Sequence, residues 1–523
     1  MANSNKKKKN STIDWASVIM KSIIVAIVVI VALFFIYMSG LLPKCVEGIK
    51  ITKKDANGKV VTIDSLPVVE VNYYYSQLLT TYRMYGYLDG IDLDSPVNSA
   101  SSTATYREMF YNNAAASVLS TAMIDDIAEQ NGFLEMSGID RYTDIAVEGV
   151  RTTASDYGFT SVEGYLSQMY GTGFSVNSLR NCVRRDSLSQ EYQNYLGQFE
   201  LVPTQEDIDN EIANNVTLYN TVDYNYYYFP ATVNSPDVSA SLELAQAEEG
   251  ANVDEELYAE VLEEANYIAD NATDPETFRE LVMDALEGDD AALEAFADDA
   301  DPTSIVGYSY DEITQYHGED SEELDFLFSD GEAGDTIVIE ATAGVYVYLL
   351  NDRYQDETPN VAYRTLTLTN EAALEEDATA EEIQAGMDAL RAEAQGLVAN
   401  VTDAAGFCAV VKDNSDVASE ILTGGYLSNQ IYPTNTDTFT DSDFALNDWL
   451  FSADRVAGDV YYLPSSDNTT LTVYYFEESA PAYIALARST LITASLTAWS
   501  DANLTAASPE YQINMWALQN LSY

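Results

Sequence analysis

Residues 325–336 (DFLFSDGEAGDT) and residues 448–460 (DWLFSADRVAGDV) share one pattern, and this pattern predicts the architecture of much of the chain. In each copy an acidic residue is followed by a short aromatic run that ends in Phe-Ser. The tripeptide Ala-Gly-Asp comes a few residues later. The flanks repeat in the same order: Gly307-Tyr308 and residues 345–348 around the first copy, Gly424-Gly425-Tyr426 and residues 471–474 around the second. The same order at one offset indicates an internal duplication, although short apolar strands can also resemble each other by chance.

Outward from these copies, the chain changes character at residue 222. Strand-like runs at residues 224–229, 336–339 and 345–350 alternate with acidic, Ala-rich helical segments. Two tandem modules of mixed α+β structure are therefore predicted, at residues 222–355 and 361–478.

The segments on either side of the modules are predicted to be helical. Within residues 66–220, Phe110 and Val118 lie on one stripe of helical spacing, and Gly132 is expected to follow the end of that helix. Thr204, three residues before Asp207, is the expected cap of a later helix. Residues 481–523 again have apolar residues to bury. We expect this C-terminal segment to pack back on the N-terminal helical domain.

The N-terminus contains a long apolar run, SIIVAIVVIVALFFIYMSGLL at residues 22–42. At about 1.5 Å per residue it can span a hydrocarbon layer of about 30 Å. Lys6 to Lys9 and Lys21 precede it, so the positive-inside rule places residues 1–21 in the cytoplasm and the bulk of the chain outside. A cleaved signal peptide is the alternative, but the run is long and no A-x-A-like site closes it. The sequence predicts a single-pass protein of the cell membrane.

The composition excludes several classes of protein. The 523 residues have a net charge of −61, which argues against nucleic-acid binding. Solubility is the simplest interpretation of this acidity, and attraction of basic unfolded segments or cations is the alternative. One histidine, His317, and three distant cysteines provide neither a zinc site nor a Ser-His-Asp relay. No metal or other cofactor is predicted.

The second module resembles a parvulin-type peptidyl-prolyl isomerase of the PpiC kind. The resemblance rests on the order of short motifs: YRTLTL at 363–368, a helix at Ala380–Val398, FCAVV at 407–411, NSD at 414–416, GGYL at 424–427, WLFS at 449–452 and AGD at 457–459. The first module resembles it more faintly. The complete layout of anchor, helical chaperone-like domain, modules and closing helix is similar to the SurA- and PrsA-like extracytoplasmic foldases, through loose motifs that cover nearly all of the exported chain.

The resemblance also implies where an active site would lie. Parvulins usually have one histidine in the first strand and one in the last, whereas the matching positions here are Thr365 and Thr472. Val417 stands where the family has an acid or a cysteine, and His317 matches neither histidine. The candidate pocket positions are Thr365, Thr472, Leu446 and Phe451 in the second module, and Tyr226, Tyr346 and Phe328 in the first.

Three functions follow as expectations. The first is a membrane-anchored foldase or chaperone that binds unfolded or nascent exported polypeptides, with degenerate active sites. The second is an active prolyl isomerase, since twisting an X-Pro amide needs desolvation and hydrogen bonds but no nucleophile. The third is a structural or adhesive acidic surface protein. No particular oligomeric state is predicted.

Overall fold

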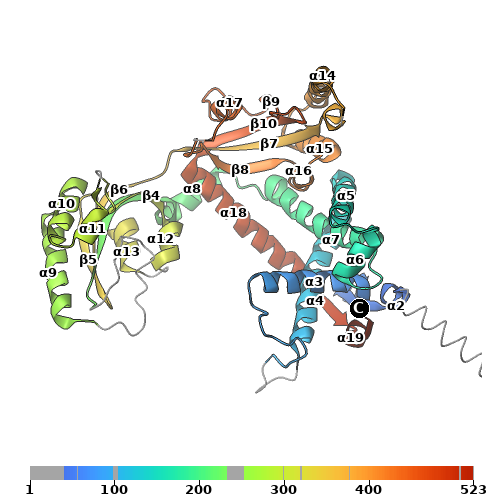
Figure 1. Cartoon of the computed structure of the whole chain (residues 1–523), viewed down its shortest axis with the longest axis horizontal. Helices are drawn as coiled ribbons and strands as arrows, with labels where there is room; N and C mark the ends of the chain where they lie inside the picture. The colour runs from blue at the N-terminus through green and yellow to red at the C-terminus, as the bar shows by residue number, and fades with distance from the viewer. Residues whose placement is uncertain are drawn as a thin grey trace, which may run out of the picture.

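The computed structural model describes residues 40–55, 57–97, 104–232, 253–297, 300–317, 321–375, 377–436, 438–505 and 508–521. Over these residues the chain is an α+β protein of several domains, with 18 α-helices and three antiparallel sheets. Figure 1 shows three parts, which we name by their residues. The helical frame comprises 40–220 and 482–521, the first module 221–354, and the second module 359–481. The predicted α+β class is confirmed.

The predicted membrane anchor lies outside the described residues, except for Gly40, Leu41 and Leu42. The two leucines belong to the short helix α2 (Leu41–Cys45). No helix in the described part of the chain combines the length and apolarity needed to cross a membrane. The anchor therefore stays a prediction from the sequence.

In the helical frame, the long helices α3 (Val68–Met84), α4 (Tyr106–Gln130) and α7 (Val176–Tyr195) pack on one another. Besides these and α2, the helices of the frame before the modules are α5 (Ile139–Asp156), α6 (Val162–Tyr170) and α8 (Gln205–Asn214). Their ends follow local chemistry, because Thr204 and Asp207 form a reciprocal capping box at the start of α8. Gly132, with φ of 72°, follows the end of α4. Both local predictions are confirmed.

The end of the chain returns to the frame in a way that the sequence did not indicate. After α18 (Ala482–Ser500), strand β11 (Glu510–Ile513) pairs with β1 (Glu47–Lys54), which also pairs with β2 (Val60–Pro67). Helix α19 (Met515–Leu521) then buries Ala517 and Leu518 in the core of the frame. The predicted helical C-terminal segment is confirmed for α18 and α19, but the sequence did not predict the strand at residues 510–513, which completes a three-stranded sheet.

The two modules have sheets of the same strand order. The first contains β3 (Thr221–Pro230), α9 (Glu255–Asn271), α10 (Pro275–Ala285), α11 (Asp290–Glu294), β4 (Ser304–Ser309), α12 (Tyr310–His317), α13 (Glu322–Asp325), β5 (Thr336–Ala341) and β6 (Gly344–Tyr354). The second contains β7 (Pro359–Thr369), α14 (Ala380–Val398), α15 (Ala404–Asn414), α16 (Ala418–Thr423), β8 (Tyr426–Ile431), α17 (Asp441–Leu450), β9 (Val460–Pro464) and β10 (Thr470–Pro481). The orders are β4-β3-β6-β5 and β8-β7-β10-β9, so in each module the strands lie as second, first, fourth and third.

The register of the strands refines the internal repeat. Tyr224 pairs with Ile305 and Val222 with Tyr308, so that Val306 and Gly307 bulge opposite one residue. In the second module Leu427 pairs with Tyr363 and Gln430 with Val361, so Ser428 and Asn429 bulge at the corresponding place. Gly307 and Asn429 both have positive φ, 76° and 56°. The structural counterpart of Gly307 is therefore Asn429, and the echo of Gly307-Tyr308 in Gly424-Gly425-Tyr426 is not an equivalence.

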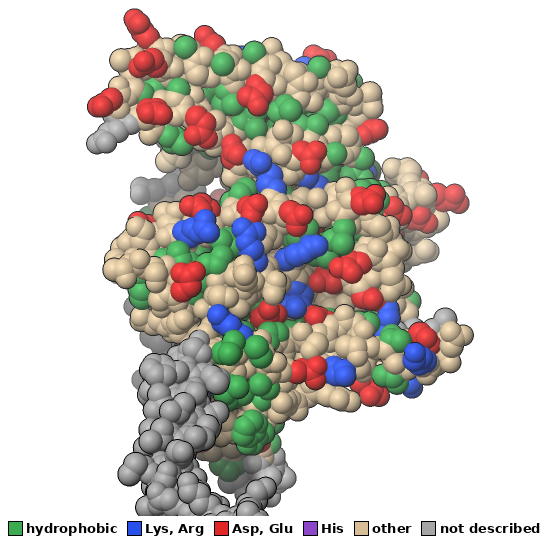
Figure 2. Space-filling view, turned by 90° about the vertical axis from the view of Figure 1, so that its right-hand side faces the viewer, with side chains coloured by type: hydrophobic (Ala, Val, Ile, Leu, Met, Phe, Trp, Pro, Cys, Tyr) green, Lys and Arg blue, Asp and Glu red, His purple; other side chains and the backbone are tan. Residues whose placement is uncertain are grey.

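The frame holds the second module through a buried ion pair and the hydrogen bonds of one arginine. Lys412 of α15 forms an ion pair of 2.9 Å with Glu191 of α7, and both side chains are nearly fully buried. Arg141 of α5 donates to the carbonyls of Asn414 and Ser415 and to the Asp416 carboxylate. Figure 2 shows the basic side chains of this side of the molecule interspersed with acidic ones. These contacts therefore fix the position of the second module against α5 and α7.

Candidate functional site: the threonine face of the second module

One face of the second sheet contains the candidate residues of the second module. Thr367 pairs with Thr472 and Thr365 with Tyr474 across β7 and β10, so these side chains share a face. We call it the threonine face. Leu366, Leu368 and Val473 point to the opposite side, where they pack with Met387 of α14 and Phe407 of α15. The strand alternation thus places the threonine hydroxyls opposite the apolar side chains of Leu366, Leu368 and Val473.

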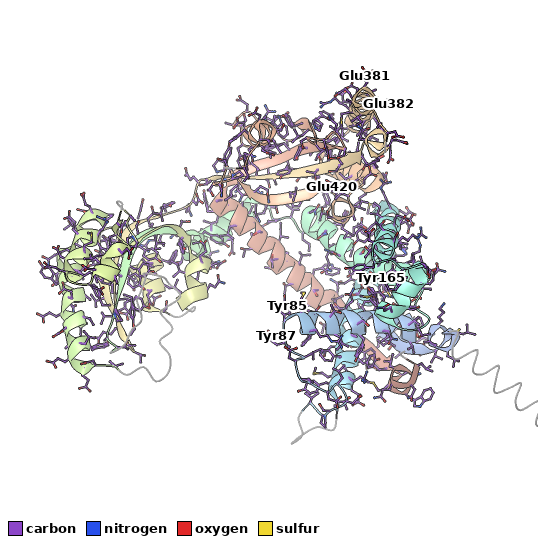
Figure 3. The ribbon with its side chains drawn as sticks, in the orientation of Figure 1. Tyr85, Tyr87, Tyr165, Glu381, Glu382 and Glu420 are labelled. Carbon is purple, nitrogen blue, oxygen red and sulfur yellow. The ribbon has the colours of Figure 1, made fainter. Side chains whose placement is uncertain are left out.

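A short hydrogen-bond network lies at one end of the threonine face. The carboxylate of Glu420, on α16, accepts bonds from the Thr367 amide at 2.8 Å and from the Thr367 hydroxyl at 2.7 Å. It accepts a third from the Ser415 hydroxyl at 2.5 Å. The hydroxyls of Thr367 and Thr472 are 3.2 Å apart. Figure 3 marks Glu420 on α16, beside the sheet.

Sequence reasoning missed Glu420 and Thr367. Ser415 belongs to the NSD motif at residues 414–416, and Glu420 follows it after five residues, but nothing in that spacing indicates a contact with a strand some fifty residues earlier. Arg141 of the frame fixes the same loop by bonding to the Ser415 carbonyl at 2.8 Å. The helical frame therefore helps to position the network.

The other end of the threonine face is apolar and aromatic. Leu446, Trp449 and Phe451 of α17 and its end pack with Val361 and Phe476. The ring of Tyr432 lies 5.4 Å from that of Phe451. The structure thus brings Leu446 and Phe451 to the same side of the sheet as Thr365 and Thr472.

Two tyrosines lie between the polar and apolar ends. The rings of Tyr363 and Tyr474 are 5.8 Å apart. Burial raises the pKa of Tyr474 to about 12, and burial also raises the pKa of Tyr363. Both phenols are therefore protonated at neutral pH and can donate hydrogen bonds. This arrangement suits binding, desolvation and hydrogen-bond donation to a carbonyl.

The corresponding face of the first module is filled. Tyr226, Tyr346 and Phe328 come together in one cluster, as their positions in the repeat imply, but each is no more than 5% exposed. Ile313 of α12 and Leu324 of α13 cover them. The rings of Tyr226 and Tyr348 stack at 5.9 Å, and those of Tyr228 and Tyr346 approach to 4.6 Å.

Burial also dominates the acid–base properties of this aromatic cluster. It raises the pKa of Tyr226 to about 12 and that of Tyr348 well above its ordinary value. The hydroxyls of Tyr346 and Tyr348 are buried without a hydrogen-bond partner among the described residues. These tyrosines form a packed interior, with little surface left for a substrate.

His317 is the last residue of α12. Within the described ranges no group of three or more His, Cys, Asp and Glu side chains is arranged to hold a metal ion. Comparison with known proteins adds no assignment, because no family model and no curated protein sequence matches this chain.

Proposed function

We propose that this chain is a membrane-anchored extracytoplasmic folding helper of the prolyl-isomerase-like class, which binds unfolded exported polypeptides. In this proposal residues 22–42 are the anchor and the helical frame is the chaperone-like domain. The two modules are parvulin-like. Two sheets of one strand order, with helices between the first and second strands of each, support that reading.

Exposed apolar side chains are the observation that carries the proposal. At the end of α3, Met84 is 76% exposed, Tyr85 65% and Tyr87 66%. Figure 3 shows the two tyrosines at the end of α3 nearest the first module in that view. Clustered apolar side chains at a surface usually mark a binding site, and tyrosine offers contact area at a low cost in rotamer entropy. Such a surface suits loose recognition of many unfolded chains.

To test this proposal, the aggregation of two reduced client proteins is measured in the presence of the full-length chain, which is solubilised in mild detergent. One client is basic (lysozyme) and one is acidic (α-lactalbumin), because a net charge of −61 could by itself retain a basic protein. We expect suppression of both at equimolar amounts, with little change in salt. Suppression of neither client, or of the basic one only and only at low salt, would overturn the proposal.

The aromatic end of α3 gives a sharper prediction. Replacing Met84, Tyr85 and Tyr87 together by Gln should reduce the suppression several-fold, since each loses most of its contact surface while the fold loses little buried area. Tyr157→Gln is the matched control, because Tyr157 is 74% exposed at the end of α5. Light scattering measures both. Equal suppression by the triple variant and the control would contradict the role of this surface.

Prolyl isomerisation is the second candidate, favoured by the threonine face. The hydroxyl of Thr365 and the phenol of Tyr474 can donate to a twisted amide, Thr472 helps to hold the neighbouring Thr367, and Leu446 and Phe451 can exclude water from the bond. A proline-limited refolding assay tests this. Any rate acceleration found should fall in Thr365→Ala and Thr472→Ala, whereas Tyr226→Phe in the closed first module should leave it unchanged.

A further inference from the structure

A crevice of about 500 Å³ lies where the second module meets the helical frame. One wall of the crevice is formed by strands β7, β8 and β10. The other wall is formed by α7, the start of α8 and α18 (Figure 1). Its volume lies within the range of sites that enclose ligands. It is distinct from the threonine face, because its strand residues Ala362 and Arg364 alternate with Tyr363 and Thr365.

Amide side chains are the commonest polar groups of the crevice. They are Gln193, Asn194, Gln198, Gln205, Asn360 and Asn429. An amide side chain both donates and accepts, as a peptide group does. Two of them already bind main-chain carbonyls of the second module, since Asn194 donates to Leu422 and Gln198 to Thr423. The lining therefore has the chemistry that recognises a polypeptide backbone.

The charged groups of the crevice are paired with one another. Arg364, 1% exposed, forms an ion pair with Glu477, and Arg488 forms one with Glu478. The Arg364 guanidinium also lies 5.1 Å from the ring centroid of Phe199 and 5.0 Å from that of Tyr426. With two cations and two anions mutually compensated, the crevice favours an uncharged ligand over a phosphate or an ammonium group.

Strand β8 adds an edge and a strained residue. It is an outer strand of its sheet, and its sequence, YLSNQI, has no charge and no proline to discourage pairing with another chain. Asn429 lines the crevice with φ of 56°, at the bulge where the first module has Gly307. Asn429 therefore has a left-handed backbone conformation that glycine adopts more easily. Non-glycine residues in such conformations are concentrated at binding sites.

We propose that this crevice binds an extended, uncharged segment of an unfolded polypeptide through its backbone. The amide side chains and the edge of β8 pair with the peptide groups, while Ile492 and Leu496 of α18 contact alternate side chains. The six residues of β8 limit the paired length to about 20 Å. This inference rests on the proposed function and names the part of the client that is recognised.

Two fluorescein-labelled peptides test the role of the backbone. Both are ten residues of Ser, Thr, Val and Gln, and one is N-methylated at alternate residues, which removes amide donors and keeps the side chains. Fluorescence anisotropy with the full-length chain in detergent should show the unmodified peptide binding at least about tenfold more tightly. Equal affinity of the two peptides would overturn the proposal.

Two variants test the location. Thr493→Phe fills the crevice from an exposed position of α18, and Ala494→Phe is its control, since Ala494 is exposed on the same helix but does not line the crevice. Asn429→Gly removes one amide and keeps the backbone conformation. Thr493→Phe and Asn429→Gly should weaken the unmodified peptide at least about fivefold, and Ala494→Phe less than about twofold.

The outcomes separate this inference from the proposed function. Unchanged affinity in both Thr493→Phe and Asn429→Gly would remove the crevice from consideration, even if client aggregation is still suppressed. Failure of the wild-type chain to suppress aggregation would remove the folding-helper proposal, while peptide binding at the crevice is measured independently of any client.

Discussion

Asp125 of α4 lies partly buried among other charged groups of the frame. Its Oδ1 has no hydrogen-bond partner among the described residues. Burial raises the pKa of Asp125 to about 8, Arg185 opposes the rise, and Asp64, Asp186 and Glu129 add to it. Arg185 itself pairs with Asp64 at 2.7 Å. The folded chain therefore binds a proton at Asp125 more tightly than the unfolded chain does.

That difference predicts a pH dependence. Stability contributed by the protonated carboxyl is complete below the unfolded pKa of about 4 and is lost as pH rises through about 8. Asp125→Asn should keep the melting temperature more nearly constant between about pH 6 and about pH 9 and raise it at the upper end. Thermal melts across this range measure the effect. Glu135→Gln, at an exposed position outside this group of charges, is the control, and an equal flattening in it would contradict the assignment.

The buried pair of Lys412 and Glu191 gives a second prediction at this scale. Burial raises the pKa of Glu191, and Lys412 opposes that rise. Lys412→Met leaves the carboxylate uncompensated and should cost about 3–5 kcal/mol near neutral pH. Adding Glu191→Gln should recover most of the loss, because the orphaned charge is removed. Urea unfolding of the single and double variants measures this, and additive losses would contradict it.

At the scale of elements, the turn from α16 into β8 depends on two glycines. Gly424 and Gly425 have φ of 63° and 73°, and a Cβ at Gly425 would lie 2.1 Å from the Thr365 carbonyl oxygen. The Gly425 carbonyl also accepts a hydrogen bond of 2.9 Å from the Thr365 amide. The backbone at Gly425 therefore cannot shift to relieve the clash without breaking this bond. This turn seats the edge strand beside β7.

Gly425→Ala should therefore destabilise the second module by at least about 3 kcal/mol, from the left-handed backbone and the clash together. Gly396→Ala is the matched control. Gly396 lies exposed within α14, a Cβ there meets nothing within 4 Å, and alanine should stabilise the helix by about 0.5–1 kcal/mol. Denaturant unfolding compares the two. A mild effect of Gly425→Ala would show that the turn can rearrange.

At the scale of the whole molecule, the two modules are attached differently. The second is bound to the frame by Lys412, Arg141 and the amides of α7. The first is entered through the short helix η3 (Val216–Tyr219), which contacts α12. Figure 1 shows it projecting away from the other two parts. We expect the frame and the second module to unfold together, and the first module to unfold by itself.

Calorimetry should accordingly show two transitions. Phe278→Ala removes a fully buried ring from the core of the first module, at a cost of about 3–5 kcal/mol, and should lower only one transition, by roughly 10 °C. Lys412→Met should lower only the other. A single transition that both variants shift would show that the three parts form one cooperative unit.

The sequence was sufficient for features that depend on neighbouring residues or on a repeated order. The capping box at Thr204, the helix Ala380–Val398 and the strand-like runs of both modules follow from short-range pattern. The α+β class followed from the alternation of those runs. The site was predicted only in part, because Thr365 and Thr472 share a face as expected, but Thr367 and the Glu420 carboxylate that it binds were not foreseen.

The sequence by itself determined that two modules with the same order of strands follow one another. It could do so because hydrophobic alternation and turn residues specify strands and turns within a few neighbouring residues. Tertiary structure decided which residues cover each face of the two sheets. In the first module Tyr226 and Tyr346 pack in one cluster with Ile313 of α12 and Leu324 of α13, whereas in the second module Thr365 is buried at 8% exposure and Thr472 is half-buried beside Thr367. It also decided that β11 completes a sheet with β1, more than 450 residues away along the chain. Such contacts depend on the shape and charge of surfaces that meet only after folding, and no local pattern encodes them.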